Sequence, residues 1–241
     1  MVVIGGGSMF KKLYKHIFFD LDHTLWDFEA SANHTLLDMF HRFALGEKGV
    51  PDGEHFIDAY HIHNDRLWSL YREGNLVKEV LRSLRFADTM RDFGFEDDEL
   101  AENLSAYYLY HSPRNVYLFP DAIEILTYLK PKYNLHLITN GFEEVQHIKL
   151  VSSGLKPFFK EIVTSEEAGV KKPDPEIFTY ALRKADASVT ESLMIGDSLE
   201  VDIIGAKNVG MDQVFFNPEG IDHNEDVTLE ITDLSELRNY I

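Results

Sequence analysis

The sequence predicts an α/β fold in which a doubly wound, Rossmann-like parallel sheet core is interrupted by an inserted domain of four helices. Over residues 113–241, short apolar runs typical of buried parallel strands alternate with segments of helical periodicity. A further apolar run lies near the N-terminus, at residues 16–20, whereas residues 28–112 show helical periodicity without a strand pattern. Strand–helix alternation of this kind favours a parallel sheet with helices on both faces.

The first strand is predicted at residues 16–20. These residues, His-Ile-Phe-Phe-Asp, form an apolar run that ends in a carboxylate, as expected for a strand buried on both faces. Upstream, residues 1–8 contain Gly-Gly-Gly-Ser, which is the composition of a flexible linker. We therefore predict a flexible N-terminal segment or tag at residues 1–8 and begin the core domain at residue 9.

The inserted helical domain is predicted at residues 28–112, so the core domain comprises residues 9–27 and 113–241. Within the insertion, apolar residues recur at helical spacing in four stripes. The stripes are Ala32, Leu36, Met39, Phe40 and Phe43; Phe56, Tyr60, His63, Leu67 and Leu70; Leu76, Val80, Leu84 and Ala87; and Leu100, Leu104, Tyr107 and Tyr108. Glycine-containing turns separate them, which predicts a small helical bundle.

The second part of the core domain is predicted to alternate between helices and strands. The helices are expected at 122–129, 143–153, 175–185, 199–209 and 233–240, and the strands at 135–138, 161–163, 193–195 and 214–216. Glycine follows two of the helices, at Gly154 and Gly210, as is common at helix ends. With the first strand, these segments predict a five-stranded parallel sheet.

Charge restricts the classes of partner. The 241 residues include 23 Lys and Arg against 41 Asp and Glu, a formal net charge of −18. Because a field of this sign repels polyanions, we expect neither nucleic-acid polymers nor anionic membrane surfaces as partners. The 44% of hydrophobic residues indicate a folded chain in spite of the charge.

The absence of cysteine excludes disulfides, thiolate zinc sites and a cysteine nucleophile, and it fits a reducing compartment. No apolar run approaches the roughly 18–20 residues of a membrane span. The short apolar piece at the N-terminus precedes Lys11 and Lys12, the reverse of the order in a signal peptide. We therefore expect a cytoplasmic protein.

Chemically capable residues follow four of the predicted strands. In a doubly wound sheet, ligands bind beyond the carboxyl ends of the strands, so these residues are expected to converge. They are Asp20 and Asp22 after the first strand; Thr139, Asn140 and Gly141 after the second; Lys171 and Lys172 in the loop after the third; and Asp197 and Asp202 after the fourth.

The carboxylates in this set predict a metal ion. Asp20 and Asp22 can face one site only if the backbone turns after them, which the polar pair His23-Thr24 allows. Together with Asp197 they would repel one another strongly without a cation. Mg²⁺ prefers oxygen ligands and accepts a few carboxylates beside water and phosphate, so it suits this set.

The motifs resemble those of the haloacid dehalogenase (HAD) superfamily of phosphohydrolases, with a helical, C1-type cap inserted after the first motif. The matching residues are Asp20 and Asp22 for the DxD motif, Thr139 for the Ser/Thr motif, Lys172 for the Lys motif, and Asp197 with Asp202 for the GDxxxxD motif. Residues 20–27 (DLDHTLWD) are also similar to the subgroup of pyrimidine and noncanonical nucleoside 5′-monophosphatases. His23 departs from the wider family, which often has glycine there.

The resemblance implies a role for each matched residue. Asp20 would be the nucleophile and Asp22 the general acid and base. The Asp20 side chain, the Asp22 main-chain carbonyl and the Asp197 side chain would bind Mg²⁺. Asp202 would orient this group, by pairing with Lys172. The residues expected to hold the phosphate are Thr139, Asn140, Gly141 and Lys172.

The expected activity is Mg²⁺-dependent hydrolysis of a small phosphorylated metabolite, with nucleoside 5′-monophosphates as the leading substrate class. A phosphatase or mutase for a small phosphosugar or phosphoglycolate is the alternative, because the cap determines the substrate. A 2-haloacid dehalogenase is disfavoured, because it would need neither Asp22 nor a metal. Trp26, Trp68, Tyr71 and Arg72 are candidates for substrate contact; for the three aromatic residues, packing explains the sequence equally well.

Overall fold

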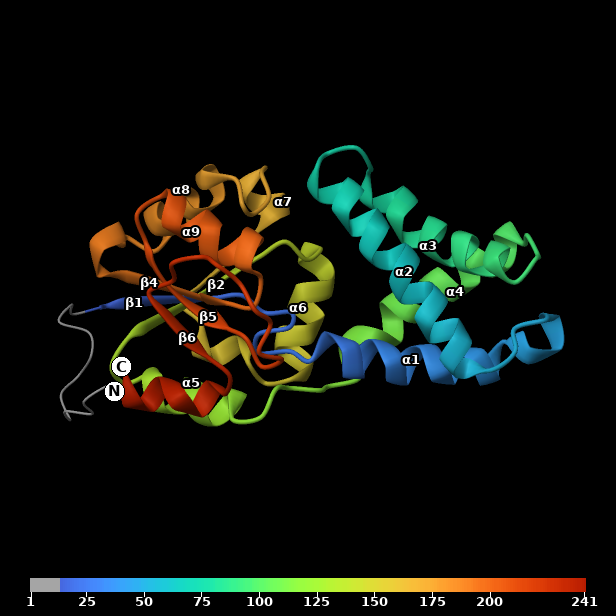
Figure 1. Ribbon diagram of the computed structural model, residues 1–241, viewed down its shortest axis with the longest axis horizontal. Helices are drawn as coiled ribbons and strands as arrows, with labels where there is room; N and C mark the ends of the chain where they lie inside the picture. The colour runs from blue at the N-terminus through green and yellow to red at the C-terminus, as the bar shows by residue number, and fades with distance from the viewer. Residues whose placement is uncertain (1–13) are drawn as a thin grey trace. The chain divides into compact units, whose positions relative to one another are not determined.

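The computed structural model describes residues 14–241, so the segment predicted to be flexible, residues 1–8, lies outside the described residues. The chain divides into two compact units (Figure 1). One contains the chain up to Asp27 together with Leu118–Ile241, and the other is Phe28–Tyr117. Two connections therefore join the units, one after the first strand and one after the last helix of the inserted segment.

The described residues of the first unit form one six-stranded sheet in the order β3-β2-β1-β4-β5-β6, with every neighbouring pair parallel. The strands are β1 (His16–Phe19), β2 (Asn134–Thr139), β3 (Glu161–Thr164), β4 (Ser192–Gly196), β5 (Asp212–Phe216) and β6 (Leu229–Ile231). β1 lies between β2 and β4, and Phe19 is in register with Leu137 and Ile195. The carboxyl ends of these three strands therefore meet at one edge of the sheet.

Helices cover both faces of this sheet, which confirms the predicted α/β class. They are α5 (Ala122–Leu129), α6 (Glu143–Ser152), α7 (Ser165–Ala168), α8 (Pro175–Lys184) and α9 (Gly205–Asn208). In Figure 1, α8 and α9 lie on one side of the sheet and α5 on the other. Phe18, Ile138 and Met194 of the strands pack in one buried cluster with residues of α8 and α9.

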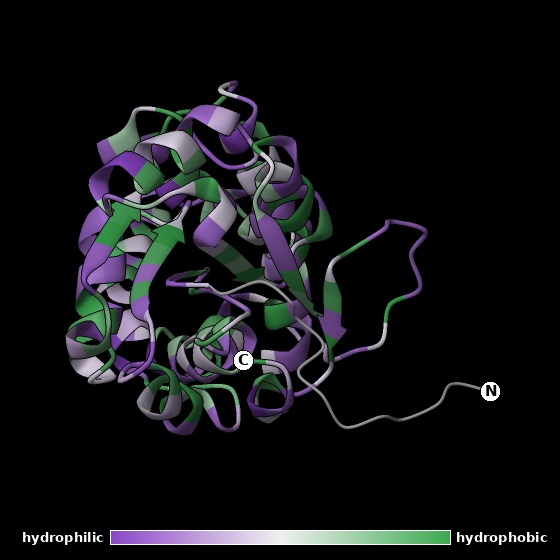
Figure 2. Ribbon diagram, turned by 90° about the vertical axis from the view of Figure 1, so that its left-hand side faces the viewer, coloured by the Kyte–Doolittle hydropathy of each residue, from purple (hydrophilic) through white to green (hydrophobic). Residues whose placement is uncertain are grey.

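The hydropathy of the elements follows their positions. The three central strands are almost entirely buried, with Ile17, Phe18 and Phe19 of β1 at 0% exposure. Figure 2 shows apolar segments on the strands, whereas the surrounding helices carry bands of both apolar and polar residues. Burial on both faces is what makes the strands of a parallel sheet visible as apolar runs in the sequence.

Three local features differ from the sequence prediction. β6 was not predicted, because it has three residues and its middle residue, Glu230, is exposed, so no apolar run marks it. The predicted helix 199–209 begins as a π-helix, Leu199–Ile204, before α9. The predicted helix 233–240 is a 3₁₀ helix at Leu234–Asn239, which Asp233 caps.

The second unit is a helical bundle. Among its described residues the helices are α1 (Phe28–Arg42), α2 (Gly53–Arg72), α3 (Lys78–Asp92) and α4 (Asp98–His111). Short 3₁₀ helices occur at Leu45–Lys48 and Ser112–Arg114. The core of the bundle includes Leu36, Phe56, Tyr60 and Leu104 of the first, second and fourth stripes. The third stripe was misplaced, because Val80 is exposed and α3 buries Leu81, Phe86 and Met90 instead. Side chains of Asp52 and Asp97 cap α2 and α4.

Within the described residues, none of the helices combines the length and apolarity that crossing a membrane requires.

A buried pair of histidines lies at the start of β1 and β2. The Nδ1 of His16 is 3.1 Å from the Nε2 of His136, and the His136 ring stacks on Phe18 with centroids 4.7 Å apart. His136 is 1% exposed. Burial, followed by the nearby charges of His16 and Lys160, lowers the pKa of His136 to about 4. The folded protein therefore resists protonation of this ring at pH values where an unfolded chain accepts a proton.

We expect His136 to make stability fall as the pH decreases from about 7.5 to about 5.5. The unfolded chain binds a proton near the ordinary histidine pKa of 6.5, the folded chain only near 4, so acid favours unfolding between these values. The expected loss is about 1 kcal/mol. His136→Phe keeps an aromatic ring and cannot titrate. Urea unfolding should show the difference between wild type and variant shifting by this amount in favour of the variant; a difference that is independent of pH would contradict the assignment.

Candidate active site

The chain turns sharply after β1, and Asp20 and Asp22 lie at the beginning of this turn. The Asp20 N–H donates to the Ile195 carbonyl at 2.9 Å, which extends the pairing with β4 by one residue. The N–H groups of Leu25 and Trp26 then donate back to the Leu21 carbonyl at 3.0 and 2.8 Å. His23 takes a left-handed conformation with φ of 63°, a region in which histidine is more common than most residues. The turn expected at His23-Thr24 is therefore present.

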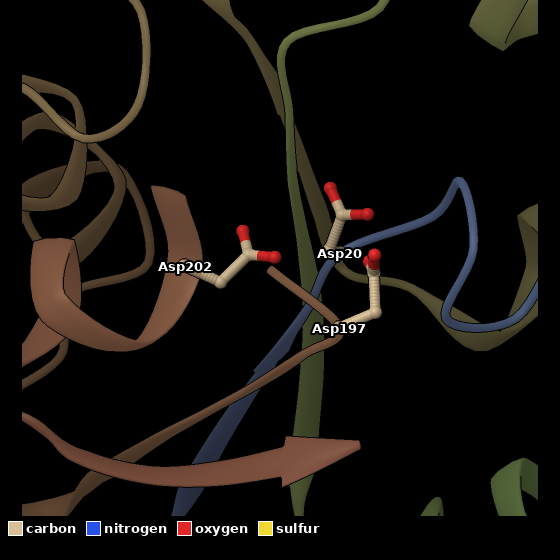
Figure 3. A group of neighbouring side chains, drawn as sticks. All are labelled: Asp20, Asp197 and Asp202. Atoms are coloured by element: carbon tan, nitrogen blue, oxygen red, sulfur yellow. The ribbon is translucent and has the colours of Figure 1, made fainter. Parts of the chain in front are cut away.

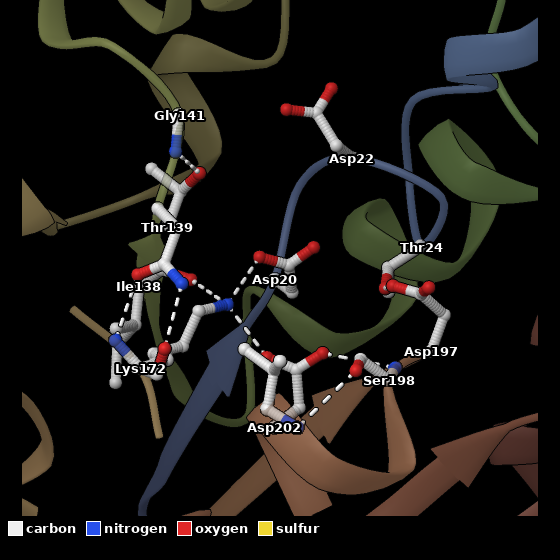
Figure 4. Close-up of polar contacts among 12 residues, drawn as sticks. Asp20, Asp22, Thr24, Ile138, Thr139, Gly141, Lys172, Asp197, Ser198 and Asp202 are labelled. Atoms are coloured by element: carbon white, nitrogen blue, oxygen red, sulfur yellow. Dashed lines mark hydrogen bonds and ion pairs between the residues drawn. The ribbon is translucent and has the colours of Figure 1, made fainter. Parts of the chain in front are cut away.

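Lys172 is a buried cation that connects several elements. Its side chain is 2% exposed, and its Nζ donates to Asp20 Oδ1 at 2.5 Å, to Asp202 Oδ1 at 2.6 Å and to the Ile138 carbonyl at 2.9 Å (Figure 4). All three ammonium hydrogens therefore have an acceptor. The pair between Lys172 and Asp202 is the one expected from the sequence.

Asn140 fixes the backbone of Lys172. The Lys172 N–H donates to Asn140 Oδ1 at 2.8 Å, and Asn140 Nδ2 donates to the Lys172 carbonyl at 2.9 Å. A side-chain amide that bonds both backbone groups of one residue holds that residue in a single orientation. The Asn140 side chain thus positions the buried lysine, whereas its N–H group remains the part predicted to bind phosphate.

Three carboxylates gather beside Lys172. Oxygens of Asp20, Asp197 and Asp202 all lie within 4.8 Å of one another (Figure 3). Asp197 accepts a hydrogen bond from Thr24 Oγ1 at 3.0 Å. Asp202 accepts a second bond, from the Ser198 N–H at 3.1 Å, and its approach depends on Gly196, where a Cβ would be only 2.4 Å from Asp202 Oδ2.

The protonation of this cluster reflects a shortage of positive charge. Burial raises the pKa of Asp20 well above its ordinary value, although Lys172 acts in the opposite direction. Burial and the charge of Asp202 raise the pKa of Asp197 to about 7. Burial disfavours the charged form of Lys172, but Asp20 and Asp202 outweigh it and raise the pKa of the lysine. One ammonium therefore does not neutralise the three acids, and an additional cation with oxygen ligands would fit the donor set.

Asp22 lies apart from this cluster and contacts α6. Lys149 Nζ forms an ion pair with Asp22 Oδ1, and Gln146 Nε2 donates to Asp22 Oδ2 at 2.7 Å. Burial alone would raise the pKa of Asp22, but Lys149 and Gln146 lower it below the ordinary value. In Figure 4 the Asp22 carboxylate is separate from that of Asp20. The carboxylate that joins Asp20 and Asp197 is thus Asp202 rather than Asp22, because α6 supplies the partners of Asp22.

Thr139 ends β2 next to these residues. Its Oγ1 accepts hydrogen bonds from the Gly141 N–H at 3.0 Å and from Gln146 Nε2 at 3.1 Å. The side chain is 1% exposed. The ends of β1, β2 and β4 and the loop that carries Lys172 therefore place Asp20, Thr139, Lys172 and Asp197 in one region of the core unit.

Comparison with known proteins identifies the family. The sequence model of the haloacid dehalogenase-like hydrolase family matches residues 14–210 of this chain. The chain belongs to this family. It is 31% identical over 230 residues to the HAD-hydrolase YfnB of Bacillus subtilis, covering 94% of each chain, and the magnesium-bound structure of YfnB superimposes with a TM-score of 0.83 over 94% of this chain and 97% of YfnB.

Two further relatives carry names that state an activity. The pyrimidine 5′-nucleotidase PynA of Streptococcus pneumoniae is 32% identical over 213 residues, which is 88% of this chain and 87% of PynA. A glyceraldehyde 3-phosphate phosphatase of Methanothermobacter thermautotrophicus is 31% identical over 242 residues, which is 95% of this chain and 100% of that protein. The relatives of this HAD hydrolase thus include phosphatases of different small phosphate esters.

The structure also places the four candidates for substrate contact. Trp26 is fully buried, and its ring lies 5.3 Å from Lys149 Nζ. In the helical unit, the rings of Trp68 and Tyr71 pack edge to face with centroids 5.4 Å apart, and Arg72 is exposed at the end of α2. Each aromatic residue therefore has a packing role within its own unit.

Sequence analysis missed the residues that hold the carboxylates in place. Thr24 binds Asp197, the Ser198 N–H binds Asp202, and Gln146 and Lys149 bind Asp22. For the last two, the sequence does contain an indication, because they share the buried side of α6 with Phe142 and Leu150. Polar residues on an apolar helical stripe need partners, and a lysine there indicates a buried carboxylate.

Replacing Lys172 by methionine should destabilise this HAD hydrolase in metal-free buffer. The change leaves Asp20 and Asp202 buried without their cation, and breaking a buried ion pair by removing one partner costs about 3 kcal/mol. Urea unfolding in the presence of a chelator measures the loss. The matched control is Lys156→Met at an exposed lysine, with an expected change within about 0.5 kcal/mol. Equal stability of the two variants would show that Lys172 does not hold the cluster together.

Proposed function

We propose that this HAD hydrolase is a Mg²⁺-dependent phosphomonoesterase that acts through an aspartyl-phosphate on Asp20, with nucleoside 5′-monophosphates as preferred substrates. The observation that carries the proposal is the position of Asp20. It stands at the carboxyl end of the central strand β1, it is 7% exposed, and Lys172 fixes one of its oxygens at 2.5 Å. A carboxylate held in this way is a preorganised nucleophile.

The reaction has two steps. An Asp20 oxygen attacks the phosphorus atom, and the bond from phosphorus to the leaving oxygen breaks while Asp22 supplies that oxygen with a proton. Asp22 then takes a proton from the water that attacks the aspartyl-phosphate, which restores free Asp20 and releases inorganic phosphate. Atoms and protons balance over the cycle, so the net reaction is hydrolysis of a phosphate monoester.

The phosphoryl oxygens need donors where charge accumulates. Lys172 already lies against Asp20, and Thr139 with the N–H groups of Asn140 and Gly141 lies at the neighbouring end of β2. We assign phosphate binding to these four residues. The hydrogen bonds between Asn140 and the Lys172 backbone keep the lysine aligned with Asp20 during the reaction.

The donor set at the sheet edge fits Mg²⁺. Asp20 and Asp197 offer carboxylate oxygens within 4.8 Å of each other, and the Asp22 carbonyl would complete the protein ligands. Asp202 would orient this set, because Lys172 and the Ser198 N–H already occupy its carboxylate. When bound, the ion supplies positive charge that keeps the carboxylates ionised and stabilises the charge on the phosphoryl group.

Two relatives suggest two substrate classes. The identity to the pyrimidine 5′-nucleotidase PynA supports nucleoside 5′-monophosphates. The similar identity to a glyceraldehyde 3-phosphate phosphatase supports a small phosphosugar as the second candidate. A 2-haloacid dehalogenase remains disfavoured, since that reaction would make no use of Asp22 or of the acidic pair Asp197 and Asp202. In either phosphatase case the partner is a small phosphorylated metabolite in the cytoplasm, and neither a nucleic-acid polymer nor a membrane.

Asp20→Asn should abolish Mg²⁺-dependent phosphate release, because an amide cannot form the acyl-phosphate. We expect wild-type activity to disappear with a chelator and to return with Mg²⁺, while the variant stays inactive under both conditions. Asp186→Asn makes the same chemical change at an exposed loop residue and should retain wild-type kcat. Phosphatase activity retained in Asp20→Asn would remove Asp20 as the nucleophile.

A screen of phosphate esters tests the substrate class. We expect kcat/KM to be highest for a pyrimidine nucleoside 5′-monophosphate when nucleotides, sugar phosphates, glyceraldehyde 3-phosphate and phosphoglycolate are compared at saturating Mg²⁺. A higher value for any sugar phosphate or triose phosphate than for every nucleotide would replace the nucleotidase proposal by the second candidate. Chloride release from 2-chloropropionate above phosphate release from all esters would overturn both.

A further inference from the structure

Helix α6 holds both oxygens of the Asp22 carboxylate. Lys149 pairs with Oδ1 and Gln146 donates to Oδ2 at 2.7 Å, so the carboxylate is fixed by two donors, one turn apart on the helix. The side chain of Asp22 is 24% exposed, whereas Lys149 and Gln146 are 3% and 1% exposed. The two donors are therefore more deeply buried than the Asp22 side chain, part of which remains accessible.

This arrangement is not the one that packing alone would produce. Removing an ammonium group from water costs several kcal/mol, and an apolar residue of similar volume is often at least as stabilising at such a position. Gln146 Oε1 is buried and has no hydrogen-bond partner among the described residues, which also costs free energy. The Gln146 amide is thus oriented to donate to Asp22 and Thr139 at the expense of its own carbonyl.

Two neighbouring residues, Gly141 and Trp26, accommodate the contacts of Gln146 and Lys149 with Asp22. A Cβ at Gly141 would lie 1.5 Å from Gln146 Nε2, so only glycine at this position lets the amide reach Asp22. The backbones of Trp26 and Asp22 form an isolated β-bridge in the turn after β1, and the buried Trp26 ring lies 5.3 Å from Lys149 Nζ. The lysine ammonium is therefore close to both a carboxylate and an aromatic ring of the same turn.

We propose that Lys149 and Gln146 are positioning residues that orient the Asp22 carboxylate for its proton transfers, chiefly for accepting a proton from the water that hydrolyses the aspartyl-phosphate. The inference rests on the proposed role of Asp22 as acid and base. Two bound oxygens hold the Asp22 carboxylate in one orientation, and a base must be aligned with the proton that it takes.

An aryl ester isolates this step. The leaving group of p-nitrophenyl phosphate departs without much protonation, so a misoriented Asp22 should slow hydrolysis of the phosphorylated enzyme more than its formation. We expect Lys149→Met to lower kcat about 10–100-fold, less than the roughly 10²–10⁴-fold of general acid–base catalysis, because Asp22 itself remains. Rapid mixing should then show a burst of nitrophenolate that approaches one per active site, with phosphorylated Asp20 accumulating.

Three variants complete the experiment. Gln146→Leu removes the other donor and should give the same burst with a smaller loss of kcat, and it serves as the test if Lys149→Met does not fold by circular dichroism. Lys149→Arg keeps the positive charge and should keep more activity than Lys149→Met. Lys207→Met changes the net charge equally at an exposed lysine of the core unit and should behave as wild type.

Asp22→Asn separates the two levels of the proposal. If Asp22 is the acid and base, this variant also shows a burst and phosphorylated Asp20. No burst and full turnover in Asp22→Asn would overturn the proposed function itself. A burst in Asp22→Asn together with a uniform loss of activity in Lys149→Met and Gln146→Leu, or with a rise in KM alone, would leave Asp22 in its role and overturn the positioning by α6.

Discussion

The ammonium group of Lys172 forms the interactions on which the candidate active site depends. It joins β1 through Asp20, β2 through the Ile138 carbonyl and the π-helix through Asp202, and it is almost completely buried. A buried cation with three acceptors fixes the relative positions of the elements that carry them, because any of these groups left alone would carry a large desolvation cost. The π-helix is consistent with this constraint, since the wider turn at Leu199–Ile204 contains the carboxylate that reaches the lysine.

The core fold could be predicted because the buried strands of a parallel sheet are recognisable in the sequence as short apolar runs. Strands such as β1 are buried on both faces and are therefore apolar throughout. β6 lacks that pattern because Glu230 faces outward, and it escaped prediction. The site was predictable only as a set of strand ends. Residue chemistry does not distinguish Lys171 from Lys172, and the choice of Lys172 came from the family resemblance. In the structure Lys172 is 2% exposed and contacts Asp20, whereas Lys171 is more exposed.

Which carboxylates cluster together could not be predicted from the sequence. Electrostatics alone treats Asp20, Asp22 and Asp197 as equivalent acids that converge on one ion. The structure instead joins Asp20 and Asp197 with Asp202, while α6 takes Asp22. The missing information was the burial of Lys149 and Gln146 on α6, which depends on how the helix packs against the turn after β1. Because helical stripes are recognised by their apolar residues, the two polar side chains on the buried side of α6, Gln146 and Lys149, were overlooked. Each acid of the DxD motif therefore has its own lysine partner. Lys172 forms an ion pair with Asp20, and Lys149 forms one with Asp22.

This division of the cations also bears on the net charge of −18. The global field of such a chain repels anions, but at physiological salt it is screened within about 8 Å, whereas a phosphate ester in the site meets charges at contact distance. Among the described residues, Lys149 and Lys172 are buried, and each is already paired with at least one carboxylate, so neither supplies a full positive charge to a ligand. Burial, reinforced by the neighbouring carboxylates, raises the pKa values of Asp20 and Asp197. A divalent cation bound at Asp20 and Asp197, as proposed, would supply additional positive charge to a phosphate dianion. In the proposed enzyme such an ion would therefore assist substrate binding as well as the chemical steps.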